Sequence, residues 1–252
     1  MTTKQKTKIA AIIQARTSSK RFYNKVFLDL KGKPVIWHLI ERLKKSNLVN
    51  HILLATTKKS SDFKLVEWAK KNKIDFFIGN ENNVLKRYYK AAKKVKADII
   101  VRITADDPLK DPILIDEVIS LLINEKLDFA CNNNPPSFPE GLDVEVFTFN
   151  SLKKAYKNVK SDFDKEHVTQ FFHDNQNIFK QKNLMSRDDL SSYRWTIDYQ
   201  EDYDMIKVIY DKLYLPNQIF HTKEIIELIK KNPEIKNINL ISLRSHRYRS
   251  KG

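Results

Sequence analysis

Cysteine is almost absent from the sequence, because Cys131 is the single thiol among 252 residues. One thiol cannot form an internal disulfide, and with six scattered histidines it cannot build a structural zinc site of the usual kind. We expect Cys131 to pack in a buried strand and not to act as a nucleophile. This cysteine usage favours a reducing, cytoplasmic location.

Long apolar runs are also missing. No segment approaches the roughly 18 consecutive apolar residues that a membrane-spanning helix needs. The first eight residues, MTTKQKTK, are polar, whereas a signal peptide would carry an apolar core there. We therefore expect neither a signal peptide nor a membrane partner.

Three glycine-based signatures are missing from a chain that has only 4 glycines. There is no GxxxxGK[ST] sequence, which disfavours a Walker-type loop, and no GxGxxG sequence, which leaves a dinucleotide cofactor without support. The GxSxG turn of α/β-hydrolases is absent as well. Any phosphate binding must therefore use a loop of another kind.

Positive charge, by contrast, is abundant. The chain has 46 Lys and Arg against 31 Asp and Glu, a formal net charge of +15, which fits nucleic-acid, anionic-membrane or nucleotide partners. The lysines are spread over helix-like segments such as KAAKKVK and KKAYKNVK, which favours solvated helix faces. A basic nucleic-acid-binding protein, anchored by Arg244, Arg247 and Arg249, is the last of three functional hypotheses.

Strand-like and helix-like segments alternate along the first half of the chain. Apolar runs predict strands, and amphipathic segments between them predict helices. This βαβα rhythm is typical of an α/β protein with a mostly parallel, Rossmann-like sheet. The predicted strands are 9–13, 51–57, 75–79, 97–104 and 127–132, and the predicted helices follow Pro34 and cover 61–73, 82–96 and 111–126.

The rhythm breaks at NNNPPSFPEG, residues 132–141, which predicts a loop. Beyond it we expect strands at 142–149 and 193–198, and helices at 150–158, 162–175, 202–214 and 222–232. We expect residues 1–240 to form a single domain. Residues 132–150 are then an excursion from that domain, and 241–252 a basic tail.

The polar loop after the first predicted strand is rich in cations. The apolar run from Ile9 to Ile13 ends at Gln14, and Gly32 and Pro34 then open an amphipathic helix. In α/β proteins, backbone N–H groups and fixed cations at the carboxyl end of a buried strand bind phosphates. The loop between them carries Arg16, Ser18, Ser19, Lys20, Arg21 and Lys25.

The stretch QARTSSKRFYNK (14–25) and the following LKGKPVIWH (30–38) resemble the opening of the sugar-activating cytidylyltransferases. The likeness is greatest to the spore-coat polysaccharide protein F family, with the 3-deoxy-manno-octulosonate (Kdo) and acylneuraminate cytidylyltransferases further off. Those enzymes often have glycine, proline and glycine where this chain has Ser18, Tyr23 and Asn24. Asn tolerates left-handed backbone angles, so Asn24 can replace a glycine, whereas Tyr23 is a larger departure.

The resemblance covers residues 8–240 and implies a nucleotidyltransferase fold of the GT-A-like kind. It also implies that the first loop binds the triphosphate of CTP. Arginine suits bidentate phosphate contacts and lysine acts as a point charge, so Arg16 and Lys25 are the predicted catalytic residues. The predicted nucleotide-binding set is Gln14, Ala15, Arg16, Ser19, Lys20, Arg21, Lys25 and Thr104.

Two carboxylates are predicted to hold Mg²⁺, the implied cofactor. ADDP, residues 105–108, is similar to a Gly-Asp-Glu-Pro run of the Kdo enzymes whose Asp binds metal, which makes Asp106 a ligand candidate. Asp198 ends a predicted strand, and a similar Asp of the relatives completes their metal site. Oxygen ligands suit this hard ion. Asp107 is either a neighbour of the metal or a cap of the turn before Pro108, while Arg102 is a candidate lining residue of this cleft.

Two further stretches, FPEGLDVEVF (138–147) and DFDKEHVT (162–169), resemble the spore-coat type of enzyme. They predict an acceptor pocket, with His167 as a candidate base because imidazole titrates near neutrality. The alternative is that the acids pair with surface lysines and His167 packs at a helix start. Arg194 and Trp195 are predicted to be structural. The acceptor candidates are Glu140, Asp143, Glu145, Glu166 and His167.

The implied reaction joins CTP to a sugar, a sugar acid or a related polyol derivative and releases pyrophosphate, for surface glycan synthesis. A homodimer is expected, with the 132–150 excursion as a candidate contact or acceptor element. A nucleotide-sugar glycosyltransferase of similar fold is the second hypothesis. Its usual DxD motif is missing, however, and Ala105, Asp106 and Asp107 are an imperfect substitute.

Overall fold

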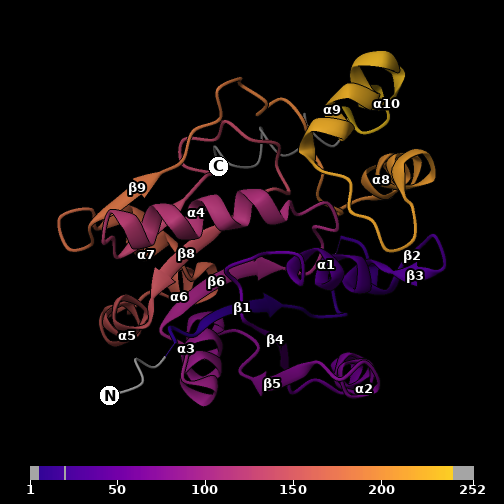
Figure 1. Ribbon diagram of the computed structural model, residues 1–252. Helices are drawn as coiled ribbons and strands as arrows, with labels where there is room; N and C mark the ends of the chain where they lie inside the picture. The colour runs from indigo at the N-terminus through magenta and orange to yellow at the C-terminus, as the bar shows by residue number, and fades with distance from the viewer. Residues whose placement is uncertain (1–5, 20, 241–252) are drawn as a thin grey trace.

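A single seven-stranded sheet organises the computed structural model, which describes residues 6–19 and 21–240. Its strand order is β5-β4-β1-β6-β8-β7-β9 (Figure 1). Neighbours from β5 to β6 are parallel, β8 is antiparallel to both β6 and β7, and β9 is parallel to β7. This confirms the predicted α/β fold with a mostly parallel sheet. The strands are β1 (Ile9–Gln14), β4 (His51–Thr57), β5 (Asp75–Gly79), β6 (Ile99–Thr104), β7 (Phe129–Cys131), β8 (Glu145–Thr148) and β9 (Gln181–Asn183).

Helices connect the strands, and side-chain caps begin several of them. Asn83 accepts a hydrogen bond from the Lys86 N–H, and Asp111 accepts one from the Ile113 N–H ahead of Pro112. A small hairpin, β2 (Asp29–Leu30) with β3 (Lys33–Pro34), and the 3₁₀ turns η1 (Lys25–Phe27) and η2 (Ser60–Asp62) lie in the loops. The helices are α1 (Val35–Leu43), α2 (Phe63–Lys71), α3 (Val84–Val95), α4 (Pro112–Asn124), α5 (Phe149–Asn158), α6 (Asp162–His167), α7 (Gln170–Asp174), α8 (Gln200–Leu213), α9 (Thr222–Lys231) and α10 (Glu234–Asn237).

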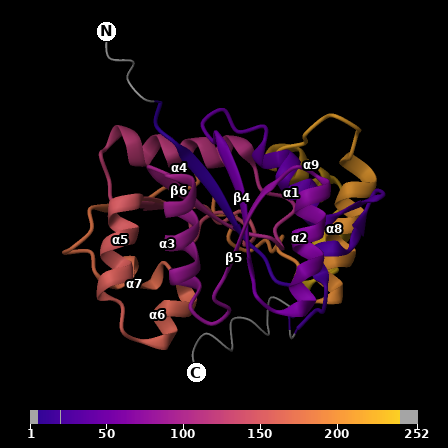
Figure 2. The same ribbon diagram turned by 90° about the horizontal axis from the view of Figure 1, so that it is seen from below.

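The two faces of the sheet are covered by different helices. Alternate residues of β1 point to opposite faces, so Ala11 and Ile13 join one buried cluster while Ala10 and Ile12 join the other. The first cluster includes residues of α1, α2, α4, α8 and α9. The second includes α3, α5 and α7, and Figure 2 shows these helices with α6 across that face. Both faces are thus dry, as a mostly parallel sheet requires.

Several predicted elements differ from the structure. Residues 193–198 are buried but form only an isolated bridge, between Arg194 and Glu140, so the predicted strand there is wrong. The predicted helix 162–175 is interrupted at Val168, which has φ +45°, because Val168 and Thr169 turn inward to be buried. The short edge strand β9 was not predicted. The basic tail, with Arg244, Arg247 and Arg249, lies outside the described residues.

None of the helices within residues 6–19 and 21–240 is long and apolar enough to cross a membrane.

Candidate active site

A polar cavity of about 180 Å³ lies at the carboxyl ends of β1 and β6. These strands are parallel neighbours and pair Gln14 with Thr104, so the residues that follow them meet at one edge. Every predicted nucleotide-binding residue that the structure describes lines this cavity, and Lys20 falls outside the described residues. The lining is Gln14, Ala15, Arg16, Ser19, Arg21, Lys25, Val26, Thr104, Ala105 and Asp106.

Asp62 holds the loop after β1 in place through hydrogen bonds to Thr17. Sequence reasoning missed this residue. Asp62 is fully buried and accepts hydrogen bonds from the Thr17 N–H (2.7 Å) and hydroxyl (2.8 Å), and from the Thr57 hydroxyl. Further along, the Asn24 N–H donates to the Thr17 carbonyl at 3.0 Å, and Asn24 has φ +58°. Asn24 therefore takes the left-handed conformation expected of a glycine substitute.

Lys25 is the centre of the site. Its side chain is 7% exposed, and its ammonium donates to the Asp106 carboxylate, to Asp198 Oδ1 at 2.8 Å and to the Ile197 carbonyl at 2.7 Å. Burial alone would lower the pKa of Lys25, but the attraction of Asp106 and Asp198 outweighs it and raises the pKa. Lys25 therefore stays charged. It joins two carboxylates that are far apart in the sequence.

Asp198 is held on both sides by cations. Its Oδ1 accepts from Lys25 and from Arg21 Nη2 (2.7 Å), and its Oδ2 accepts from Arg194 Nη2 (2.9 Å). Burial alone would raise the pKa of Asp198, but Lys25, Arg21 and Arg194 together lower it. Asp198 is consequently ionised, with both oxygens fixed in direction.

No regular strand precedes Asp198, and the buried side chain of Arg194 holds it in place instead. Its side chain is fully buried, and its Nε donates to Asp202 Oδ1 at 3.1 Å while its Nη1 lies 2.5 Å from Glu140 Oε1. Asn239 closes this group by donating to the Arg194 carbonyl (2.9 Å) and to Asp202 (3.0 Å). Arg194 is structural, as predicted, but it acts on the site through Asp198.

Gly141 allows the excursion, residues 132–150, to pack closely against the backbone at Trp195. A Cβ at that position would lie 2.6 Å from the Trp195 carbonyl carbon, and Gly141 has φ +102°. Both the contact and the backbone angle exclude larger residues. The excursion is thereby fixed against the segment that carries Asp198.

The predicted acceptor residues divide into two groups. Glu145 is buried, forms an ion pair with Arg102 and accepts a hydrogen bond from the Thr169 hydroxyl at 2.8 Å. Burial alone would raise the pKa of Glu145, but Arg102 outweighs it and lowers the pKa. Burial raises the pKa of Asp143 to about 6, against the opposing effect of Lys110 and with the help of nearby acids that include Glu140 and Glu145. Glu140, Asp143 and Glu145 thus lie within electrostatic range of one another.

Glu166 and His167, in contrast, are exposed on α6. The His167 ring lies 4.3 Å from that of Phe163. His167 is the last residue of α6, so it does not pack at a helix start as the alternative expected, and its role as a base stays a prediction.

Asp107 and Cys131 are both buried. Asp107 accepts from Thr104 at 2.5 Å, and its ion-pair partner is Lys110, at 3.0 Å. Burial raises the pKa of the Cys131 thiol to about 11, so it stays protonated as a packing residue.

The oxygen set around Lys25 suits a hard divalent cation. Within the described part of the chain, no group of three or more His, Cys, Asp and Glu side chains gathers into a metal site. Asp106 and Asp198 nevertheless converge, with the Ile197 carbonyl, on the single positive charge of Lys25. Two carboxylates completed by phosphate oxygens and water match the usual coordination of Mg²⁺.

A second basic cavity, of about 500 Å³, lies at the carboxyl ends of β4 and β5. Arg87 is buried at the wall of this cavity and donates from Nη1 to the Asn80 carbonyl at 2.6 Å. Burial lowers the pKa of Arg87, and the positive charge of Arg16 lowers it further. Gly79 leaves room for this arginine, because a Cβ there would lie 2.7 Å from Arg87 Cγ. Sequence reasoning missed this cavity. Its lining includes Lys58, Lys59, Gly79, Asn80, Lys86, Arg87 and Lys90.

Comparison with known proteins gives a consistent result. Residues 10–236 match the family described as Cytidylyltransferase. An uncharacterized protein of Methanocaldococcus jannaschii, MJ1063, is 41% identical over 92% of this chain and 94% of its own. The spore coat polysaccharide biosynthesis protein SpsF of Bacillus subtilis is 30% identical over 90% of this chain and 95% of its own. The solved structure of a cytidylyltransferase from Leptospira borgpetersenii superposes with a TM-score of 0.87 at 34% identity, covering 91% of this chain and 97% of that one.

Proposed function

Because the chain belongs to the cytidylyltransferase family and is a nucleotidyltransferase, we propose that it transfers CMP from CTP to a small hydroxyl-bearing acceptor and releases pyrophosphate. The acceptor is a sugar, a sugar acid or a related polyol derivative, and the product serves a surface polysaccharide. The observation that carries the proposal is Lys25, held between Asp106 and Asp198 on the floor of a cavity lined by Arg16 and Arg21.

The chemistry asks for fixed positive charge around a triphosphate. As the acceptor oxygen approaches the α-phosphorus in line, charge builds on the phosphate oxygens and on the leaving pyrophosphate. Arg16 and Arg21 face the cavity as phosphate ligands, and Lys25 is positioned by two carboxylates before substrate arrives. Donors that need not reorganise during the reaction stabilise this charge most effectively. The second basic cavity, beside Arg87, offers room for the rest of the nucleotide.

We assign Mg²⁺ to Asp106 and Asp198. When bound there, the ion supplies Lewis-acid stabilisation of phosphate charge. Lys25, Arg21 and Arg194 together keep Asp198 ionised, and Arg194 binds its Oδ2. Among the predicted acceptor residues, Glu140 is joined to this arrangement, because it contacts the same Arg194. We therefore place the acceptor on the side of the excursion and not beside His167.

The test is pyrophosphate release with each of the four nucleoside triphosphates, Mg²⁺ and a panel of sugar acids, sugar phosphates and polyol phosphates. We expect release with CTP and a matching acceptor. Asp106→Asn and Asp198→Asn should lower the rate by about 100-fold or more, as removal of transition-state charge stabilisation does. Asp211→Asn is the matched control, because Asp211 is a half-exposed carboxylate whose partner is the surface residue Lys31.

The outcomes separate the possible errors. Absence of release, combined with thermal stabilisation by CTP, means that the acceptor is missing from the panel. Absence of both release and CTP binding overturns the proposal. Sugar transfer from a nucleotide sugar without pyrophosphate would favour the glycosyltransferase hypothesis. Salt-sensitive binding of arbitrary DNA or RNA would favour the nucleic-acid hypothesis. The homodimer is a separate proposal, which sedimentation of the pure protein tests.

A further inference from the structure

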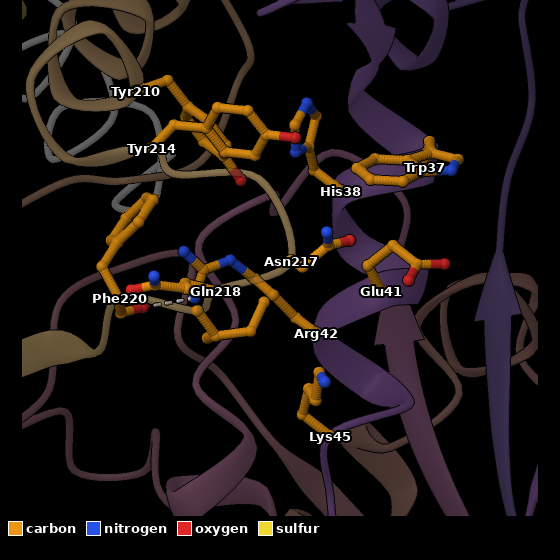
Figure 3. A pocket seen from close by; sticks show the side chains of 11 residues that line it. Trp37, His38, Glu41, Arg42, Lys45, Tyr210, Tyr214, Asn217, Gln218 and Phe220 are labelled. Carbon is orange, nitrogen blue, oxygen red and sulfur yellow. Dashed lines mark hydrogen bonds between the residues drawn. The ribbon is translucent and has the colours of Figure 1, made fainter.

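A cavity of about 110 Å³ lies between α1 and the connection from α8 to α9, and it shares no lining residue with the cavity around Lys25. Figure 3 shows side chains of α1 pointing toward Tyr214, Asn217 and Phe220 across it. Nothing in the proposed reaction uses this place. Its lining is Trp37, His38, Glu41, Arg42, Lys45, Tyr210, Tyr214, Asn217, Gln218, Ile219 and Phe220.

Arg42 gives the cavity an uncompensated positive charge. The residue is 2% exposed, and its Nη1 donates to the Phe220 carbonyl at 2.8 Å and toward the Lys110 carbonyl at 3.4 Å. No carboxylate among the residues that the structure describes forms an ion pair with it. Glu41 is not its partner, because Glu41 binds Lys44 at 2.7 Å. A buried cation without a counter-ion is costly, so an anion that reached it would be stabilised.

The walls around Arg42 are aromatic. Its guanidinium lies 4.2 Å from the centre of the Phe220 ring. The His38 ring packs edge-on against Trp37, Tyr210 and Tyr214. Burial lowers the pKa of His38 to about 4, so this ring is neutral near pH 7 and, like its neighbours, offers an uncharged wall. The cavity of about 110 Å³ is smaller than the roughly 150 Å³ of an engineered cavity that holds benzene, so nothing larger than a single ring suits it.

We propose that this cavity binds a small planar anion, an aromatic ring that carries one carboxylate. The ring lies against Trp37 and Tyr214, and the carboxylate reaches Arg42 with Lys45 as the outer cation. The ligand is an anion because the side chains without a counter-charge here are cations, and it is planar because the walls are flat rings.

A ligand in this cavity should change the mobility of the segment that follows Asp106, because wall residues contact that segment. Tyr210 donates its hydroxyl to the Pro108 carbonyl at 2.7 Å, and Arg42 reaches the Lys110 carbonyl. His221 directly follows the wall residue Phe220 at the end of the α8–α9 connection, and its ring lies 3.0 Å from Asp111. Pro108, Lys110 and Asp111 are therefore each contacted by a wall residue of the cavity or by the residue next to one. The proposal includes this coupling, through which the ligand regulates the site.

The probe is 4-fluorobenzoate, followed by ¹⁹F NMR line broadening on the full chain, with 4-fluorobenzyl alcohol as the uncharged comparison. We expect the acid to bind and the alcohol to bind at least about fivefold more weakly, because it lacks the charge. Lys45→Gln should weaken the acid about fivefold, whereas Lys71→Gln, which removes the same charge from an exposed lysine of α2 outside the cavity, should not. Trp37→Leu should abolish binding while leaving the fold intact.

Hydrogen exchange tests the coupling without any turnover or CTP. Saturating benzoate should slow amide exchange in segment 106–111 by about twofold or more in the wild type and leave it unchanged in Trp37→Leu. Equal binding of acid and alcohol, or binding that survives Trp37→Leu, overturns the site. Binding without any change of exchange in 106–111 overturns the coupling. Neither readout depends on the proposed cytidylyl transfer, so failure of one is distinguishable from failure of the other.

Discussion

Asp106 and Asp198 both contact Lys25, yet the protein holds them in opposite ways. Asp106 follows a regular strand, is 22% exposed, and has Lys25 as its ion-pair partner among the described residues. Asp198 follows an irregular segment, is 7% exposed, and is contacted by Arg21, Lys25 and Arg194. Asp106, which follows the regular strand, has fewer ion-pair contacts. Asp198, which follows the irregular segment, is held by three side chains.

This difference suggests a division of labour within the site. Where a hydrogen-bonded ladder sets the backbone, as in β6, a side chain can remain free to change partners. Where no ladder exists, the position must be set by buried charges, and those charges keep Asp198 in one orientation. We infer that Asp198 is the fixed ligand and Asp106 the adjustable one. The following predictions test that inference.

The largest expected effect comes from Arg194→Met. Removing the guanidinium leaves Asp198 and Asp202 buried without their cation. We expect the free energy of unfolding to fall by about 3–5 kcal/mol, as when one member of a buried ion pair is removed. Denaturant titration measures it. Arg187→Met, at an exposed arginine, is the control and should stay within about 0.5 kcal/mol. Equal effects of the two substitutions would show that Arg194 does not support the site.

The two aspartates themselves should differ in stability. At pH 7, Asp198→Asn should lower the free energy of unfolding by about 2 kcal/mol, because three cations lose a buried carboxylate. Asp106→Asn should cost less than about 1 kcal/mol. The pKa of Asp198 is lowered in the folded state, so its contribution is present above the ordinary value of 3.8 and is lost as the pH falls below it.

The gap between wild type and Asp198→Asn should therefore close in acid. The gap should be equal at pH 7 and pH 5 and should narrow only below about 3.8, so unfolding titrations at pH 7, 5 and 3 measure it. A gap that stays constant over this range, or an Asp106→Asn variant that is equally destabilised, would remove the contrast between the two residues.

The smallest effect is expected at Asn24, which precedes Lys25 and sets its approach to both carboxylates. Asn24→Ala should destabilise by about 1 kcal/mol, because the left-handed conformation at φ +58° disfavours a Cβ without a polar group. Asn24→Gly is the matched variant and should be neutral or slightly stabilising. If alanine and glycine behave alike in thermal unfolding, the backbone at this position is not under the constraint described.

The first half of the fold was predictable because its signals are local. β1, β4 and β6 are continuous apolar runs ended by polar loops, and caps such as Asp111 begin helices within a few residues of the signal. The meeting of Gln14 and Thr104 at the cavity around Lys25 followed from the same logic, since parallel neighbouring strands end at one edge. The metal and acceptor roles came from family resemblance and remain proposals.

What escaped prediction depends on single contacts between distant segments. Trp195 and Ile197 alternate with polar residues as in a strand, and they are buried, but the Trp195 and Ile197 N–H groups donate to the carbonyls of Glu140 and Asp106. No local pattern encodes such partners. A signal did exist in Arg194, a cation inside the apolar run YRWTID, because a buried charge implies a carboxylate nearby. Asp62 offered no comparable clue, since its partners Thr17 and Thr57 carry no charge.

Asn239 also sets the order in which the protein can become active during synthesis. Strands β1 and β6, which end at Gln14 and Thr104, lie in the first half of the chain, whereas Lys25 needs Ile197 and Asp198 from the second half as partners. The group formed by Arg194 and Asp202 is closed only by Asn239, more than forty positions after Arg194. Since chains emerge and fold from the N-terminus, β1 and β6 can pair long before Asp198 is held in place. A partly made chain is thus expected to pair its parallel strands before it fixes Lys25, and the group around Asp198 is complete only when the segment around residue 239 has docked.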